Sequence, residues 1–106
     1  MPDASDVVDN PAASRLELHL DGSMAELIYA QQGDRLVLIH TEVPEALEGR
    51  GIGGTLVTAA VGRAERDEAI VVPRCPFARR WLERHPDVAS RVHVDWPAAA
   101  APDGEG

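Results

Sequence analysis

Two titratable side chains, His40 and Glu42, lie near the end of an apolar run that predicts a strand over residues 35–43. Side chains two positions apart in a strand point to the same face, so this pair is expected to share one. An imidazole or a carboxylate there can accept a proton from a substrate, which makes both residues candidate general bases. The alternatives are a partly buried histidine and a solvated acid at the end of a strand.

A glycine-rich loop follows that strand and opens an apolar pattern that predicts a helix over residues 52–67. The N-terminus of a helix leaves N–H groups unpaired and attracts anions, and glycines let a phosphate approach the main chain. We therefore expect a phosphate-bearing ligand to contact the five residues that open this helix, Arg50, Gly51, Ile52, Gly53 and Gly54. The alternative is a tight structural turn. The chain lacks lysine and hence the Gly-Lys-Ser/Thr motif of a P-loop phosphohydrolase.

A third candidate is Cys75, the one cysteine of the chain. Pro76 suits the first position of a helix predicted over residues 76–85, which makes Cys75 its N-cap. A helix N-terminus and the neighbouring Arg74 both favour the thiolate, so Cys75 could act as a nucleophile. The alternative is a buried, inert thiol.

The elements that position these residues alternate between short strands and helices. Period-two alternation and turn residues predict an antiparallel meander of three strands, at residues 15–20, 24–30 and 35–43. A strand–helix–strand unit adds a parallel strand at residues 69–74, and a last strand is expected at 91–95. The order is β-β-β-α-β-α-(β), which predicts an α/β fold with a mixed sheet.

One domain accounts for the folded part of the 106-residue chain. Residues 1–14 and 97–106 are rich in Ala, Pro and acids without an apolar period, so both are expected to be disordered, leaving a domain over residues 15–96. The apolar run at 36–39 is expected to be buried on both faces, and Trp81 and Leu82 are expected in the core.

The formal net charge is -8 and all ten basic residues are arginine, which disfavours nucleic acid as a partner. No apolar run is long enough for a membrane span, and no secretory leader is apparent, so a cytoplasmic location is the expectation. His40, His85, His93 and Cys75 lack the spacing of paired metal ligands, so no metal is expected.

Five features occur in a fixed order along the chain: His-Thr-Glu-Val-Pro at residues 40–44, the glycine loop, the apolar helix, the next apolar strand and Cys75-Pro76. This order resembles the GNAT acetyltransferase superfamily, and most of all its short members. The resemblance covers about residues 15–87. It implies that residues 48–53 hold the pyrophosphate of acetyl-CoA. It also implies that the strands at 35–43 and 69–74 splay apart around the pantetheine arm, with the backbone of Glu42 and Val43 pairing with its amides.

Three departures from the GNAT pattern matter. The loop begins with Glu48 rather than Gln or Arg, and Phe77 stands near the position where many GNAT enzymes carry a tyrosine as general acid. Larger members also insert two helices between their first two strands, whereas here a short turn at residues 21–23 connects them. The acceptor side should therefore be open, to be completed by a bulky substrate, a protein terminus or a second subunit in a homodimer.

The resemblance thus implies an acetyl-CoA-dependent N-acetyltransferase with an amine acceptor. Two routes remain open: direct attack with His40 or Glu42 as base, and a covalent route through Cys75. The alternative from another class is a CoA-binding or protein-interaction module without transfer activity, which Glu48 and Phe77 favour.

Overall fold

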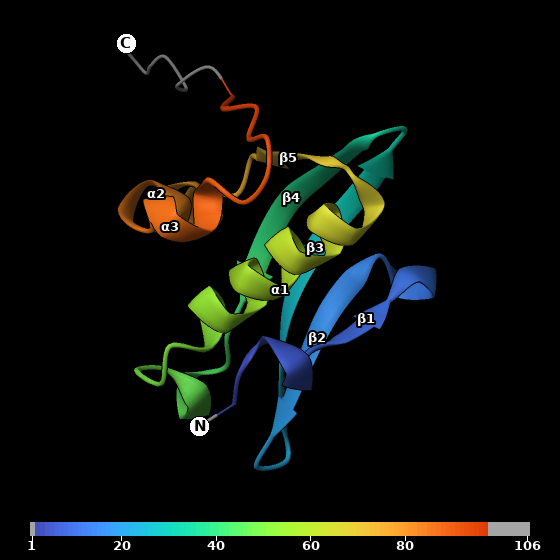
Figure 1. Ribbon diagram of the computed structural model, residues 1–106. Coiled ribbons are helices and arrows are strands. Elements are labelled where there is room, and N and C mark those ends of the chain that lie inside the picture. Colours follow the sequence, from blue (N-terminus) through green and yellow to red (C-terminus); the bar gives the residue numbers. More distant parts are fainter. Residues whose placement is uncertain (1, 98–106) are drawn as a thin grey trace, which may run out of the picture.

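The computed structural model describes residues 2–97 and shows a five-stranded sheet in the order β1-β2-β3-β4-β5 (Figure 1). The first four strands are antiparallel neighbours and β4 pairs with β5 in parallel. The strands are β1 (Val8–Asn10), β2 (Arg15–Leu20), β3 (Ser23–Gln32), β4 (Arg35–Glu42) and β5 (Ile70–Pro73). The mixed α/β sheet expected from the sequence is confirmed.

Tight turns set the register of the meander. Asp21 and Gly22 both have positive φ, of 54° and 78°, which suits the two-residue turn between β2 and β3. Strand pairing across that turn places Leu16 opposite Leu27. The apolar side chains of neighbouring strands therefore fall on one face of the sheet.

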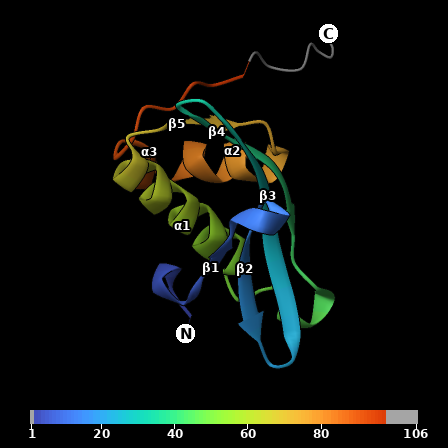
Figure 2. The same ribbon diagram turned by 90° about the vertical axis from the view of Figure 1, so that its right-hand side faces the viewer.

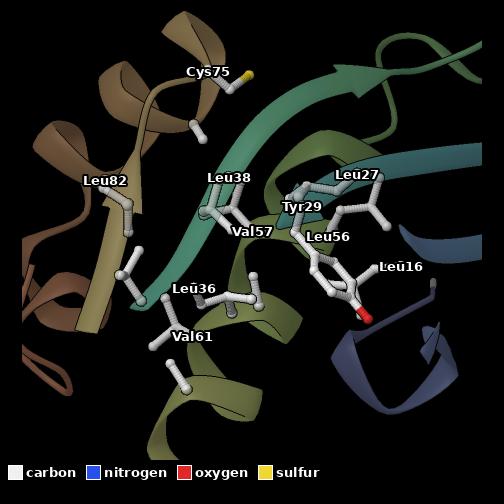
Figure 3. Close-up of a cluster of buried hydrophobic side chains, with 14 of the residues drawn as sticks. Leu16, Leu27, Tyr29, Leu36, Leu38, Leu56, Val57, Val61, Cys75 and Leu82 are labelled. Atoms are coloured by element: carbon white, nitrogen blue, oxygen red, sulfur yellow. The ribbon is translucent and has the colours of Figure 1, made fainter. Parts of the chain in front are cut away.

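Helix α1 (Ile52–Asp67) packs on that face, which we call the core face. Its buried residues recur at helical spacing and meet the apolar side chains of β2, β3 and β4 (Figure 3). Helix α2 (Pro76–Arg84) contributes Ala78 and Leu82 to the same cluster, and α3 (Pro86–Ala89) follows it directly. The opposite face, which we call the open face, has no α-helix over it among residues 2–97 (Figure 2).

The first fourteen residues differ from the expectation of disorder, because residues 4–13 form the 3₁₀-helices η1 (Ala4–Asp6) and η2 (Pro11–Ala13) on either side of β1. Polar side chains anchor this segment: the Tyr29 hydroxyl donates to Asp9 at 2.6 Å, and the Asn10 amide donates to Glu17 at 3.0 Å. The folded unit thus begins before Arg15. Of the tail predicted to be disordered, residues 98–106 lie outside the described residues.

The strand predicted at residues 91–95 is reduced to a single parallel bridge between Val71 and Val94. The N–H groups of Arg91 and Val92 donate instead to the carbonyls of Val88 and Ala89. Because these donors continue the turns of α3, a ladder along β5 cannot begin before His93. Helix α2 also ends at Arg84, one residue before the predicted His85, which precedes a proline.

Candidate active site

The parallel strands β4 and β5 pair for four residues each, from Arg35 opposite Ile70 to Leu38 opposite Pro73, and then separate. The main-chain N–H groups of Arg74 and Cys75 both donate to the carbonyl of Leu38, at 3.0 and 2.8 Å. Beyond this point β4 continues to Glu42 in pairing with β3. The sheet therefore opens on the β5 side of residues 39–42, where that edge of β4 has no strand partner among residues 2–97 and could pair with a ligand.

A β-bulge lies in β4 at the same place. Tyr29 pairs with Leu38 and the preceding Ile28 pairs with His40, so Ile39 is the extra residue. Residues 36–38 are buried, as the sequence predicts, but Ile39 is 45% exposed. The prediction of burial on both faces is therefore wrong at Ile39, because the bulge interrupts the ladder there.

The bulge decides which face carries His40 and Glu42. Directly opposed residues of neighbouring strands share a face, and Leu27 of the core face pairs with Thr41. His40 and Glu42 pair with Ile28 and Glu26, which point to the open face. Without the extra residue, strict alternation from Leu38 would have turned both side chains toward the core.

A groove of about 560 Å³ occupies the gap where the sheet opens. It is bounded by the end of β4, the loop before α1, the first turn of α1 and the exposed face of α2. The lining residues are His40, Thr41, Glu42, Val43, Leu47, Glu48, Gly49, Gly51, Ile52, Gly53, Gly54, Phe77 and Trp81. The groove thus brings together His40, Glu42, Val43 and four of the five loop residues predicted from the sequence.

The first turn of α1 presents its main chain to this groove. Its N-cap is Gly51 in the left-handed region, with φ of 72°, and none of the described side chains caps it. The first N–H groups of a helix have no partner within the helix, so those of Ile52, Gly53 and Gly54 are available to an anion.

Packing against α2 is a second reason why residues 53 and 54 are glycines, and the sequence did not reveal it. A Cβ at Gly53 would lie 2.5 Å from the Phe77 ring, and a Cβ at Gly54 would lie 2.3 Å from Nε1 of Trp81. The aromatic rings of α2 therefore lie directly on the first turn of α1. Phe77 and Trp81 form the groove wall opposite β4. The two aromatic residues are four positions apart on a helix and face two consecutive glycines. This spacing is the sequence signal that could have identified them.

Of the two charged residues in the loop before α1, Glu48 lies at the groove and Arg50 does not. The Arg50 guanidinium is paired with Asp21 at 2.9 Å and is not among the groove-lining residues, whereas Glu48 lines the groove. The one arginine predicted to contact phosphate is thus held at the β2–β3 turn.

Cys75 is the N-cap of α2, as the sequence predicts, but its side chain is 2% exposed and does not line the groove. Its Sγ lies 3.4 Å from Oγ1 of Thr41, beside β4 and within the apolar cluster (Figure 3). The structure therefore does not bring Cys75 together with the other predicted site residues. Trp81, expected in the core with Leu82, is half-buried in the groove wall and stacks on His85 at a centroid distance of 3.8 Å.

His40 and Glu42 form a pair, with Nε2 of the imidazole 2.7 Å from Oε1 of the carboxylate. Their side chains are 56% and 64% exposed. They border the groove on one side and belong to the open face on the other. A ligand in the groove and a second reactant on the open face would meet at this pair.

Within the described residues, no group of three or more His, Cys, Asp or Glu side chains is arranged to hold a metal ion. None of the helices among residues 2–97 has the length and apolar character needed to cross a membrane.

The sequence and the fold of this chain are both similar to those of known proteins. The family model described as GCN5-related N-acetyltransferase matches residues 15–92. Among curated proteins, the chicken and human proteins named NATD1 are each 35% identical to this chain over 63 residues, which is 58% of this chain and 57% and 56% of theirs. The chain thus spans a little over half the length of these relatives.

A GCN5-like protein from Staphylococcus aureus, solved by NMR in solution, superposes with a TM-score of 0.68 over 98% of this chain and 100% of that one. The two sequences are 20% identical, so the likeness concerns the fold.

Proposed function

Because the chain belongs to the GCN5-related N-acetyltransferase family, we propose that it transfers an acetyl group from acetyl-CoA to an amine. The observation that carries this proposal is the groove between the free edge of β4 and the uncapped N-terminus of α1. A cofactor with an amide-containing arm and a pyrophosphate needs a strand edge at one end and anion-binding N–H groups at the other.

Most of the groove-lining residues suit acetyl-CoA, the proposed acetyl donor. The free edge of β4, including the backbone of Glu42 and Val43, would pair with the amides of the arm, and the N–H groups of Ile52, Gly53 and Gly54 would bind the pyrophosphate. The volume of about 560 Å³ is within the range of small-molecule sites. Glu48 opposes the fit, because a carboxylate beside phosphates is repulsive. Arg50 would need to leave Asp21 to compensate for it.

Acetyl-CoA supplies an activated thioester, and the chain supplies position and a proton acceptor. Direct attack by the amine is favoured over the covalent route, because the Cys75 thiol is buried outside the groove while His40 and Glu42 border it. Phe77 lines the groove without a hydroxyl, so this aromatic side chain gives the leaving thiolate no proton.

Calorimetric titration with acetyl-CoA, CoA and ATP tests the donor site. Saturable binding of both CoA compounds, without binding of ATP, is the expected result. Transfer is then measured as thiol release with three acceptors: spermidine, a lysine-containing peptide and a peptide with a free N-terminus. Failure of both CoA compounds to bind would overturn the proposal.

The second candidate is a CoA-binding module without transfer activity, which the presence of Glu48 and Phe77 in the groove favours. Tight binding of acetyl-CoA with neither acetylation of any amine nor hydrolysis of the thioester would establish it in place of the enzyme.

A further inference from the structure

We propose that His40 is the proton acceptor for the amine through its Nδ1 atom, and that Glu42 is a positioning residue that holds the imidazole by its Nε2 atom. The proposal rests on the proposed function and assigns separate roles to the two candidate bases. It also places the acceptor amine on the open face of the sheet.

The tautomer of His40 follows from its contact with Glu42. Nε2 lies 2.7 Å from Oε1 of Glu42, and an ionised carboxylate can only accept hydrogen bonds. Nε2 must therefore carry the hydrogen and donate it. In the neutral imidazole this leaves the lone pair on Nδ1, which is the atom free to take a proton.

The alternative base, Glu42, is less suited to the task. A proton taken by His40 produces an imidazolium beside a carboxylate at 2.7 Å, which strengthens the existing bond into a charge-assisted one. A proton taken by Glu42 would remove the charge that holds the imidazole. The geometry therefore favours proton transfer to the histidine.

Charges on the neighbouring strands explain why Glu42 turns to His40. Glu42 lies directly opposite Glu26 of β3, and Glu26 lies opposite Glu17 of β2, so three carboxylates form a row across the open face. Like charges in such positions repel each other. Arg15 of β2 compensates two of them, with distances of 2.6 Å to Glu17 and 3.2 Å to Glu26. Glu42 instead accepts a hydrogen bond from Nε2 of His40.

These charges also complete the surroundings of the imidazole. His40 faces the apolar Ile28 directly across β3, with Glu26 diagonal to it, and Arg15 is the next residue in that row on β2. Besides His40 and Glu42, the titratable side chain among the groove-lining residues is Glu48. Carboxylates around the imidazole therefore outnumber the one cation named, Arg15, and this balance of charge attracts a cationic amine.

Acetyl transfer at this pair is a direct displacement of the CoA thiolate by the amine. The amine, after an ammonium form has lost its first proton to solvent, approaches from the open face. Its nitrogen lone pair forms a bond to the thioester carbonyl carbon while a second proton passes to Nδ1 of His40. The carbon–sulfur bond breaks with its electron pair on sulfur, and the CoA thiolate takes a proton from water. His40 then returns its proton to solvent.

The same arrangement of His and Glu two residues apart occurs on β2, where Nε2 of His19 lies 2.9 Å from Glu17, which supplies a matched control. His19 is 61% exposed, close to the value for His40, and is not among the groove-lining residues. The experiment compares His40→Gln, Glu42→Gln and His19→Gln for turnover, pH profile and acetyl-CoA affinity, using acetyl-CoA with spermidine and the lysine peptide.

We expect His40→Gln to lower kcat by about 100-fold or more, and to abolish the fall in rate toward acidic pH that protonation of a base causes. Glu42→Gln should lower kcat on the order of tenfold, the worth of one charge-assisted hydrogen bond, and should keep the fall in rate toward acidic pH, because His40 is still present. His19→Gln should change neither, and all three should keep the wild-type affinity for acetyl-CoA.

Wild-type turnover and an unchanged pH profile in His40→Gln, or a larger loss in Glu42→Gln than in His40→Gln, would overturn the assignment. A second readout does not depend on transfer: long-range ¹H–¹⁵N spectra of the wild-type protein should show His40 protonated at Nε2 and bare at Nδ1. The opposite tautomer would refute the inference even in an active enzyme. Absence of transfer in the wild type, with the expected tautomer, would instead refute the proposed function.

Discussion

Replacing Gly54 by alanine tests the packing of α2 on the first turn of α1. Alanine favours a helix over glycine by about 1 kcal/mol, so the substitution would be stabilising if space allowed it. At Gly54 it does not, because the new Cβ would lie 2.3 Å from Nε1 of Trp81 and 2.8 Å from a second atom of the same ring. Trp81 is stacked on His85, which restricts its retreat.

The magnitude follows from two opposing terms. Overpacking of this kind costs typically about 1–3 kcal/mol, and the gain in helix propensity offsets about 1 kcal/mol. Gly54→Ala should therefore lower the free energy of unfolding by about 1 kcal/mol. Gly62 in the same helix is the matched control, since a Cβ there meets Arg66 alone, at 3.8 Å. Gly62→Ala should raise the free energy of unfolding by about 1 kcal/mol.

Urea unfolding monitored by circular dichroism measures both values, and thermal unfolding should show shifts of opposite sign of about 4–8 °C. Equal stabilisation by the two substitutions would refute the packing argument. A double variant refines the test: in a Trp81→Leu background the clash is relieved, so Gly54→Ala should become neutral or stabilising there.

Three further predictions concern other parts of the chain. Hydrogen bonds from Asn10, His19 and Arg15 lower the pKa of Glu17 from its ordinary value of 4.5 to about 2, so the stability they contribute is present above pH 4.5 and lost as the pH falls toward 2. Urea titrations across that range should show a smaller loss for Glu17→Gln. Tyr29→Phe removes the 2.6 Å bond to Asp9 and should cost about 1 kcal/mol, with faster amide exchange in β1. Cys75→Ala should lower the unfolding midpoint yet retain turnover with acetyl-CoA and amine, whereas loss of turnover in the folded variant would restore the covalent route.

Helix α1 illustrates what the sequence predicts well. Its apolar residues recur at helical spacing, and Gly51 takes the left-handed conformation directly before it, so the predicted bounds of residues 52–67 agree with the structure. The signal is local and strong. The same holds for the order of elements from β2 to α2, which short turns and apolar periods determine together.

The bulge at Ile39 illustrates what local patterns leave out. Neither glycine nor proline marks it, yet it decides that His40 and Glu42 point to the open face. Their shared face was predictable, since both residues follow the bulge. Strand β1 was missed for a related reason: polar contacts from Tyr29 and Glu17 hold it, and these residues are distant in sequence. The burial of Cys75 likewise depends on where β4 passes.

The strands β4 and β5 separate after Leu38 and Pro73, and we call this point the fork. It depends on main-chain atoms, since the Leu38 carbonyl accepts the N–H groups of residues 74 and 75. Every residue except proline carries such an N–H. In evolutionary terms, the position of the fork is therefore nearly independent of side-chain identity. Neutral drift can replace Arg74 or Cys75 without moving the mouth of the groove, provided that the substitute is not proline and fills the same volume. A search for distant members of this fold should accordingly give more weight to the spacing between the strands than to the residue types at positions 74 and 75.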